Sequence, residues 1–510
     1  MITIGPMISI PGSRMPECSG AVGSGGFGAT ANPPLPTMGL RFAVRLVVLA
    51  SLPLFAAACH FAPPHVQRPL PTPAVYDPMN GPATGTRPMN LGWRDFFPDP
   101  RLDALIEAAL AHNRDLAVSV ARIEQARGFY RIQNADRYPA PVVAAGASRS
   151  HNGRIAAGAA AAGDVTIDRA SINVAVNQFE LDFWGRVRDL TASARAEYLA
   201  TIQAQRAFRL SLIQDVASTY LASIETAEQI RLAERTAQSR REGVRIAQVR
   251  QRAGLTSALD LHQAESLLAQ AEASLAGLQL TQVQVNNQLL LLVGGPVAGP
   301  LPAPLPLTQQ TAATALVAGL PSELLLARPD VLAAEERLRS AEASIGAARA
   351  AFFPSISLTG IFGFASSALN TLVGNDGLTW SFAPTLVTPI FNRGRLRGNA
   401  TVARAQGEIA VAEYERTIQV AFQEVSNALA GRAYLAEEVA AQERGTIAQR
   451  QIAALAQTRY LEGVVSYLEV LDAERNLFAS EQELLRLRRA NVENLVALYV
   501  ALGGGTAERR

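Results

Sequence analysis

Gly185-Arg-Val-Arg188 and Gly394-Arg-Leu-Arg397 stand 209 residues apart, and the same shift aligns Gly254-Leu-Thr-Ser257 with Gly463-Val-Val-Ser466. The alignment needs no gap over more than a hundred residues. Agreement of this length identifies an internal repeat, which has to be recognised before any fold is assigned.

The repeat extends upstream with a different shift. Asp115 to Pro139 aligns with Asp330 to Pro354 at a distance of 215 residues, so the first copy carries six additional residues before Gly185. We place them in the loop-like run 156–163, which consists of alanine and glycine. The proline-rich stretch 294–306 is expected to link the two copies.

Each copy is expected to contain two long helices that form a hairpin. Residues 186–252 contain no proline and are rich in helix-forming residues, and a helix of this length would extend roughly 100 Å. Apolar or small residues then recur three and four positions apart, as in a coiled coil. In the first helix these are Leu210, Ile213, Ala217, Tyr220, Ile224 and Ala227. In the returning helix they are Leu268, Ala271, Leu275, Leu278, Val285, Leu289 and Leu292, with Gln282 interrupting the series. The hairpins are predicted to turn at Gly254 and Gly463.

Four segments alternate apolar with polar or small residues, namely 141–149, 172–181, 356–364 and 380–386. Such segments are typical of a transmembrane β-barrel, although a single one also fits the edge hairpin of a soluble protein. Four strands are too few to close a barrel, and an open edge would leave backbone groups unsatisfied in lipid. If these strands span a membrane, several chains must share one barrel.

The N-terminal region indicates export. Arg41 and Arg45 precede a mostly apolar run, 46–58, that is too short to span a bilayer as a helix and is typical of a secretory signal. The run ends in Ala56-Ala-Ala-Cys59, which resembles a bacterial lipobox and implies acylation of Cys59. The alternative is an ordinary signal peptide that happens to end near a cysteine. The glycine-rich run 23–28 lacks the strand and helix that a dinucleotide site requires, and we expect translation to start at Met38.

The composition argues against several classes of protein. A net charge of +2 and 49% hydrophobic residues fit neither a nucleic-acid-binding protein nor a disordered chain. With cysteine only at Cys18 and Cys59, no disulfide framework or cysteine-based metal site is expected in the remainder of the chain. The histidines are scattered, and no catalytic motif is found, so no enzymatic activity, metal or cofactor other than the lipid on Cys59 is expected. These histidines are His60, His65, His112, His151 and His262.

The duplicated unit, the two glycine turns and Cys59 together resemble the TolC-like outer-membrane factor family. The resemblance is greatest to its lipoprotein branch (OprM and NodT type), which works with RND pumps and has a signature similar to Leu320-Pro-Ser-Glu-Leu-Leu-Leu-Ala-Arg-Pro-Asp-Val331. It covers about residues 59–504. It implies a mainly α protein with β structure, in which three chains form a twelve-stranded transmembrane barrel continued by a coiled-coil helical barrel in the periplasm.

The function that this resemblance implies is that of an outer-membrane exit duct in a tripartite pump that exports small molecules and drugs. Its expected partners are two further copies of the chain, a periplasmic adaptor, an inner-membrane RND-type pump and outer-membrane lipid. Type I protein secretion and heavy-metal efflux are alternatives within the same fold, and the scarcity of Met and His weakly disfavours metals. A periplasmic adaptor would instead have one hairpin flanked by compact β-domains.

The resemblance also assigns the candidate site residues. The tips that dock the adaptor are Gly254, Leu255, Thr256 and Ser257 in the first copy and Gly463, Val464, Val465 and Ser466 in the second. In the stretch that closes the aperture, Leu468 would be a hydrophobic constriction, Glu469 and Asp472 would face the pore, and Arg475 would bridge neighbouring helices. Glu469 and Asp472 are three residues apart and therefore share a helix face. Exposed carboxylates at the start of a solvated helix are the alternative interpretation.

These predictions divide the chain into consecutive segments. They are an N-terminal extension (1–37), a lipoprotein signal (38–58), a lipid-anchored proline-rich tether (59–100), the first repeat (101–295), a linker (296–327), the second repeat (328–504) and a tail (505–510).

Overall fold

The computed structural model describes residues 61–66, 69, 71–73, 76, 85–152, 165–297, 299–310, 316–317, 319 and 328–505. Several predictions lie outside these residues: the extension 1–37 with its glycine-rich run, the signal 38–58, Cys59 and the loop 156–163. The first part of the signature, 320–327, also lies outside them. The described residues belong to one unit, Cys59–Arg510.

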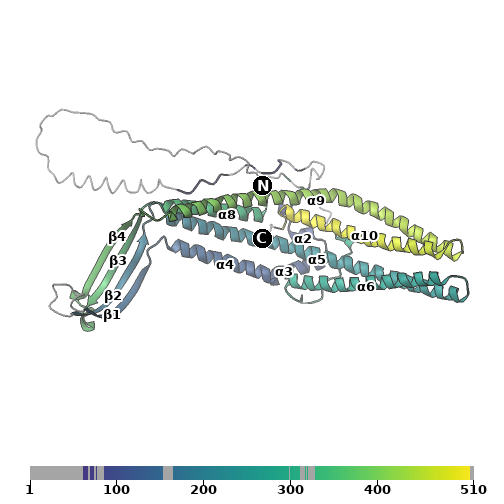
Figure 1. The fold of residues 1–510 in the computed structure, drawn as a ribbon, viewed down its shortest axis with the longest axis horizontal. Helices are drawn as coiled ribbons and strands as arrows, with labels where there is room; N and C mark the ends of the chain where they lie inside the picture. The colour runs from purple at the N-terminus through teal and green to yellow at the C-terminus, as the bar shows by residue number, and fades with distance from the viewer. Residues whose placement is uncertain are drawn as a thin grey trace, which may run out of the picture. The chain divides into compact units, whose positions relative to one another are not determined.

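The helices repeat in length and spacing along the chain (Figure 1). Helices α4 (Arg114–Ala135) and α8 (Pro329–Ala350) each have 22 residues, and α5 (Arg186–Arg252) and α9 (Arg395–Leu461) each have 67. Helices α6 (Ala258–Val293) and α10 (Tyr467–Ala501) follow the two turns. The predicted helix 186–252 is confirmed in its bounds, as are the turns at Gly254 and Gly463.

The four predicted strands form one antiparallel sheet of order β1-β2-β3-β4. They are β1 (Pro141–Asn152), β2 (Val165–Glu180), β3 (Ser355–Ser366) and β4 (Leu378–Val387). Short 3-10 turns η5 (Leu369–Thr371) and η6 (Asn375–Gly377) lie between β3 and β4. Within the described chain β1 and β4 each have only one neighbour, so each leaves an edge unpaired.

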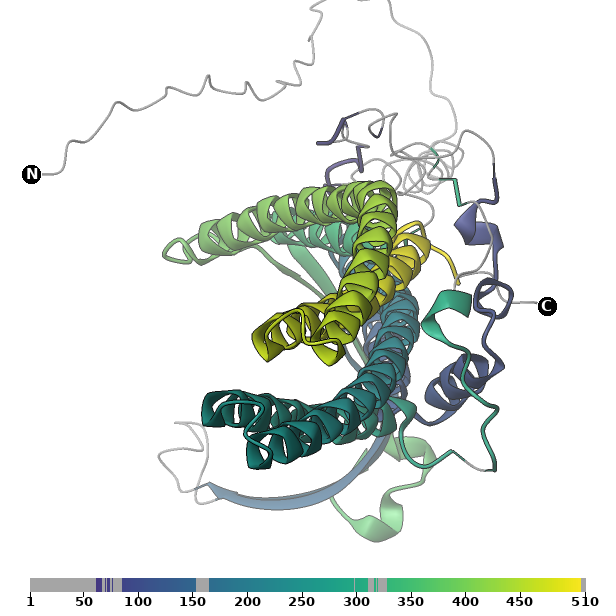
Figure 2. The ribbon, with the colours of Figure 1, turned by 90° about the vertical axis from the view of Figure 1, so that its right-hand side faces the viewer.

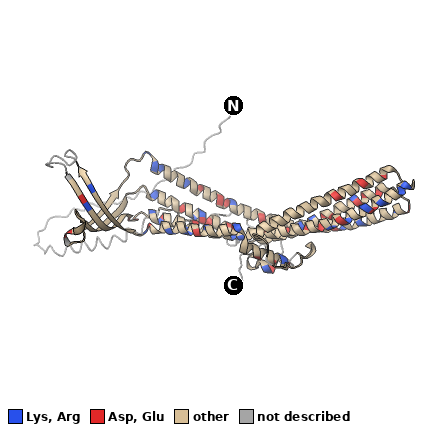
Figure 3. Cartoon of the chain, turned by 90° about the horizontal axis from the view of Figure 1, so that it is seen from below, with Lys and Arg blue, Asp and Glu red and all other residues tan. Residues whose placement is uncertain are grey.

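The register separates the two faces of the sheet. Val143, Val174, Phe362 and Trp380 lie opposite one another across all four strands, and their side chains are 74, 46, 59 and 71% exposed. The adjacent row, which points to the other face, consists of the small or polar residues Ala144, Asn173, Gly363 and Thr379. One apolar and one polar face is the pattern of a barrel strand between lipid and an aqueous lumen. Charged residues are few on the strands and frequent along the helices (Figure 3).

Helix α5 is the central element of the helical part. It packs against α4 and α8 over its first half and against α6 and α10 over its second (Figure 1). Its predicted seam is buried from Leu210 to Ile224, whereas Ala227 and most of the seam of α6 are only partly covered. At the interruption, Gln282 donates to the Ser223 hydroxyl of α5 over 2.9 Å. Seen from the tips, the hairpins α5–α6 and α9–α10 lie side by side along a curved wall (Figure 2).

A core lies where the two repeats meet near the middle of the helices. Short elements from the predicted tether enter it, namely η2 (Pro88–Asn90) and α2 (Trp93–Phe96), followed by α3 (Pro100–His112). Phe96 stacks on Tyr499 with ring centroids 4.1 Å apart, and both are buried. The linker contributes η3 (Leu307–Gln309), whose Leu307 is also buried. The segment 85–97 therefore packs into the core, which its proline content had not indicated.

Residues 61–66 lie along α8. Phe61 stacks on Phe353 at 4.8 Å, and its carbonyl accepts a hydrogen bond from Arg349. His65 contacts both Glu335 and Glu342, at 3.4 and 2.9 Å. Among the described residues, no helix combines the length and apolar character needed to cross a membrane.

Candidate aperture and docking tips

The two predicted tips share one backbone conformation. Gly254 and Gly463 adopt φ values of 70° and 76°, in the left-handed region that favours glycine. The residue after each glycine donates its N–H to a carbonyl five positions back, Leu255 to Arg250 and Val464 to Arg459, over 2.8 and 2.9 Å. This is the Schellman arrangement, which satisfies carbonyls at the end of a helix.

The side chains of the first tip stabilise their own helix. Ser257 caps α6 by accepting from the Asp260 N–H, and the Asp260 carboxylate accepts in return from the Ser257 N–H. The Thr256 hydroxyl also donates to Asp260. This hydrogen bond is the main cause that lowers the pKa of Asp260. The carboxylate of the first tip is therefore held at the start of α6, where the helix dipole favours negative charge.

The second tip is built differently at the matching positions. Ser466 occupies the N-cap of α10, but its side chain makes no capping hydrogen bond. Glu469, which corresponds to Asp260, forms an ion pair with Arg459 of α9 over 2.7 Å. The carboxylate of the second tip thus joins the two helices of the hairpin. The role of Arg459 was not predicted. The sequence offered one signal for it, its position about one helical turn before Gly463.

The predicted aperture residues lie on the exposed side of α10. Leu468 is 57% exposed although it is a large apolar residue. Arg475 pairs with Asp472 one turn before it on the same helix. Among the described residues the ion pair of Arg475 stays within α10, and its bridge to a neighbouring helix stays a prediction. The pair that joins two helices here is the one between Glu469 and Arg459. Both carboxylates of the aperture stretch are therefore paired with an arginine.

A pocket of about 360 Å³ lies close to the two tips and is lined by α6 of the first repeat and α10 of the second. Leu468, Asp472 and Arg475 line it from α10. The residues of α6 that line it are Leu259, His262, Gln263, Ser266 and Leu267. Leu259, Gln263 and Ser266 are the residues that precede Leu468, Asp472 and Arg475 by 209 positions. Matching positions of the repeats thus face one pocket, with an acid and a base on α10 and neutral residues on α6.

Behind the aperture, the α5–α10 interface contains buried polar groups. The Tyr467 hydroxyl lies against Gly243, where a side chain would clash with it, and burial raises the pKa of Tyr467 to about 12. Burial also raises the pKa of Glu474 and lowers that of Arg240. Arg240 donates to the Leu267 carbonyl over 2.8 Å and so reaches α6 as well. These groups were not predicted, because their burial depends on packing between the repeats.

A cation–aromatic contact also joins the two hairpins. The Arg250 guanidinium lies 4.7 Å from the centre of the Tyr460 ring, and Tyr460 in turn lies 5.0 Å from Tyr467. Arg250 matches Arg459 of the other repeat, so equivalent arginines make different contacts.

In the described part of the chain, no group of three or more His, Cys, Asp or Glu side chains is placed to hold a metal ion.

Comparison with known proteins identifies the family. The sequence profile of the family described as "Outer membrane efflux protein" matches residues 105–295 and 320–504, once for each repeat. The chain is 42% identical over 412 residues to the solvent efflux pump outer membrane protein SrpC of Pseudomonas putida, covering 81% of this chain and 87% of that protein. It is 37% identical over 455 residues to the cation efflux system protein CusC of Escherichia coli K12, covering 89% and 97%. The fold is similar to the open state of the Neisseria gonorrhoeae MtrE outer membrane channel, with a TM-score of 0.78 and 35% identity over 88% of this chain and 98% of that one.

Proposed function

The chain belongs to the outer membrane efflux protein family and is an outer-membrane efflux channel protein, and from this premise we propose that three copies form the exit duct of a tripartite pump. The observation that carries the proposal is the sheet with two unpaired edges and one apolar face. Pairing β4 of one copy with β1 of the next satisfies both edges, and three copies close a twelve-stranded barrel. In this arrangement the row from Val143 to Trp380 faces lipid.

The helices support the same assembly. In the single chain, α4, α6 and α9 leave large apolar side chains exposed. Examples are Ile132 of α4, Leu280 of α6 and Leu455 of α9, all at least 60% exposed. Apolar surface on this scale marks a protein interface. Neighbouring copies would cover it by continuing the wall into a closed tunnel.

The tips form the gate and the docking site in this proposal. A three-fold axis turns Glu469 and Asp472 into rings of carboxylates, which favour cations and hold the closed state through pairs that can be broken. Leu468, exposed in one chain, would narrow the same aperture. The Gly254 and Gly463 turns, with the three residues that follow each, would dock a periplasmic adaptor that couples the duct to an inner-membrane RND-type pump.

Lipidation of Cys59 is part of the proposal. Phe61 lies at the end of α8 nearest to β3, where Phe61, Phe353 and Trp184 stack in succession with centroids 4.8 Å apart. Aromatic side chains concentrate at the membrane interface. Cys59 precedes Phe61 by two residues, which span at most about 7 Å of extended chain. An acyl chain on Cys59 would therefore start close to this interface.

The proposed cargo is a class of compounds. Relatives of similar identity are named for export of solvents and of cations. We propose small organic molecules as cargo, because a metal relay would need Met or His side chains and the chain contains only 6 Met and 5 His. Metal or protein export is the second candidate. The duct itself is not expected to be an enzyme, and the only covalent group expected is the lipid.

Native mass spectrometry and planar-bilayer recording of the full chain test the assembly. We expect a detergent-resistant trimer with discrete single-channel currents, and a monomer without currents would overturn the duct.

Mass spectrometry of the mature N-terminus should show an acylated Cys59, and the Cys59→Ser variant should keep the trimer without the anchor. Solvent, antibiotic and heavy-metal susceptibility of a deletion strain would separate the cargo classes.

A further inference from the structure

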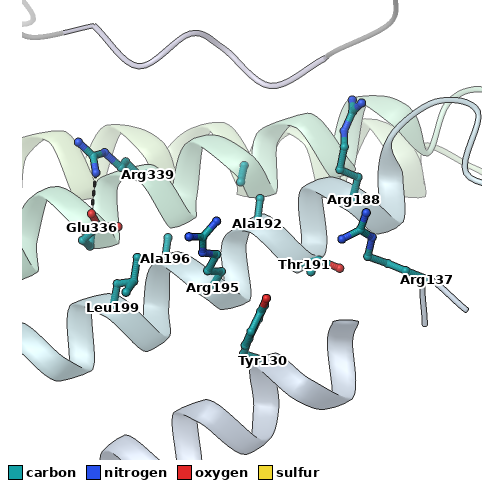
Figure 4. A pocket seen from close by; sticks show the side chains of 11 residues that line it. Tyr130, Arg137, Arg188, Thr191, Ala192, Arg195, Ala196, Leu199, Glu336 and Arg339 are labelled. Carbon is teal, nitrogen blue, oxygen red and sulfur yellow. Dashed lines mark hydrogen bonds and ion pairs between the residues drawn. The ribbon is translucent and has the colours of Figure 1, made fainter. Parts of the chain in front are cut away.

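A second pocket lies far from the tips, between α4, α5 and α8 near the sheet, and has a volume of about 490 Å³ (Figure 4). This size is within the range of small-molecule sites. Four arginines line it, Arg137, Arg188, Arg195 and Arg339, with Glu336 as the single carboxylate of the lining. Figure 4 shows Tyr130 pointing from α4 toward α5 beneath Arg195.

The arginines of this pocket are not equally neutralised. Arg339 is paired with both Glu335 and Glu336 over 2.6 Å, and the Arg188 guanidinium lies 3.7 Å from Asp189. Arg195 makes no ion pair with any residue that the structure describes. Arg137 reaches only the amide oxygen of Asn134, over 3.4 Å. The pocket therefore has two guanidinium groups without a carboxylate, and such groups bind planar or tetrahedral oxyanions through paired N–H donors.

The position of the pocket along the chain indicates what could reach it. Arg137 lies four residues before β1, and Arg188 follows β2 by eight residues. Both are thus at the junctions between strands and helices, close to the aromatic stack of Trp184 and Phe353. In a channel whose strands cross the outer membrane, these junctions lie at the inner, periplasmic leaflet.

Glu335 of α8 connects the pocket with the N-terminal segment. Glu335 contacts Arg339 of the pocket and His65 of the segment that follows Cys59, at 2.6 and 3.4 Å. If Cys59 is anchored in the periplasmic leaflet, this segment lies outside the tunnel, and so does the flank of α8 that it shares with the pocket. The pocket is then open to lipid headgroups rather than to cargo in the lumen.

We propose that this arginine pocket binds the phosphate of an anionic phospholipid headgroup in the periplasmic leaflet of the outer membrane. Basic pockets between helices at the membrane interface bind acidic headgroups by the same chemistry. Arg137 and Arg195 supply the free guanidinium groups, and Arg188 and Arg339 extend the positive field. Binding ties α4, α5 and α8 together just below the barrel. This inference rests on the proposed orientation of the chain in the outer membrane.

The test measures lipid binding to the purified full chain by native mass spectrometry, with titration of phosphatidylglycerol or phosphatidylethanolamine. We expect one phosphatidylglycerol per chain, bound about tenfold more tightly than phosphatidylethanolamine, and loss of this preference in the double variant Arg137→Gln with Arg195→Gln. The matched control is Arg337→Gln with Arg416→Gln, which removes the same charge from a separate pocket between α8 and α9. The control should bind phosphatidylglycerol as the wild type does.

Two outcomes would overturn the proposal. One is an unchanged lipid preference in the pocket variant, or an equal loss in both double variants, which would indicate general electrostatic attraction. The other is binding of inorganic phosphate or glycerol phosphate as tightly as the lipid, which would make the pocket a site for soluble anions. Trimer mass and bilayer currents are recorded on the same samples, so a conducting trimer without lipid preference refutes this inference alone. Failure to form a trimeric channel refutes the proposed function instead.

Discussion

The two hairpin tips have the same backbone but use their side chains for different tasks. Both turn through a left-handed glycine with matching hydrogen bonds. In the first tip Asp260 caps its own helix, whereas Glu469 of the second tip reaches across to Arg459. Glutamate is one methylene longer than aspartate, and its carboxylate contacts Arg459 of the neighbouring helix, whereas the matching Arg250 lies over the Tyr460 ring. The difference indicates that duplication preserved the turn, which sterics dictate, and left the charges free to specialise.

The two repeats also differ in charge one and two turns further along α6 and α10. Asp472 and Arg475 of α10 correspond to Gln263 and Ser266 of α6, which face the same pocket without charge. We therefore expect the second tip to carry the electrostatic part of the gate and the first tip to act as its fixed support. Each prediction below changes one tip and uses the other as its reference.

The largest effect is expected from Glu469→Gln combined with Asp472→Asn. Each exposed pair contributes about 0.2–1 kcal/mol, so three copies contribute at most about 3 kcal/mol if one pair per copy holds the gate. That amount shifts the balance between closed and open states by up to roughly a hundredfold. Single-channel recording should show higher conductance and a weaker cation preference.

The first tip supplies the control for this experiment. Asp260→Asn also removes a carboxylate, but one that is held in a capping box, and its effect on conductance should be much smaller. Arg475→Ala should also raise conductance, but it leaves the carboxylates in place and should not weaken the cation preference. Unchanged conductance and selectivity in the double variant and in Arg475→Ala would mean that these residues are ordinary solvated positions, and the duct would remain without this gate.

The second prediction concerns the shared backbone. Gly254→Ala and Gly463→Ala should each destabilise their turn by about 1–2 kcal/mol, because a side chain disfavours the left-handed region. No atom lies within 4 Å of the added methyl group at either position, so strain is the only expected cost. Hydrogen exchange at the two tips should report equal losses of protection, and asparagine at either position should cost less. Unequal losses would show that the turns are not equivalent.

Much of this comparison could be predicted from the sequence. The contacts that could not be predicted depend on packing between segments far apart in the chain. The repeat, the hairpins, the strands and the turn glycines depend on periodicity and local sterics, which a sequence displays directly. The partner of Glu469 depends on how α9 and α10 pack. The burial of Glu474 depends on how α5 and α10 pack. The core position of Phe96 was missed for a related reason, since prolines nearby suggested an extended tether and its stacking partner Tyr499 lies in the last helix of the chain.

The third prediction separates the two helix caps. Ser257→Ala removes a capping hydrogen bond and should destabilise the start of α6 by about 1 kcal/mol. Ser466→Ala, at the matching position, removes no such bond and should destabilise the start of α10 by only a few tenths of a kcal/mol. Hydrogen exchange in the first turns of α6 and α10 would measure both. A comparable loss in the two variants would indicate that Ser466 caps α10 in solution.

The smallest effect is expected from pH and involves Glu474 and its counterpart Glu265. Burial raises the pKa of Glu474 in the folded chain above its ordinary value of 4.5, although Arg240 opposes the shift. A raised pKa means that the folded state binds the proton more tightly than the unfolded state. The packing of α10 on α5 is therefore most stable below pH 4.5 and loses stability as the pH rises through the higher, folded-state value. Glu265 is exposed and pairs with His262 over 3.0 Å.

Glu474→Gln should remove this dependence, because the amide cannot ionise, whereas Glu265→Gln should leave it intact. The readout is hydrogen exchange in the part of α10 around Glu474, near its start, between pH 4 and pH 8, corrected for the intrinsic exchange rate. Conductance recorded over the same range would show whether loosening at this interface reaches the aperture, since Tyr467 and Leu468 are neighbours in sequence. If the wild type and Glu474→Gln lose protection in parallel as pH rises, the ionisation of Glu474 does not control this interface. The contrast between Glu474 and Glu265 would then have no effect on this interface.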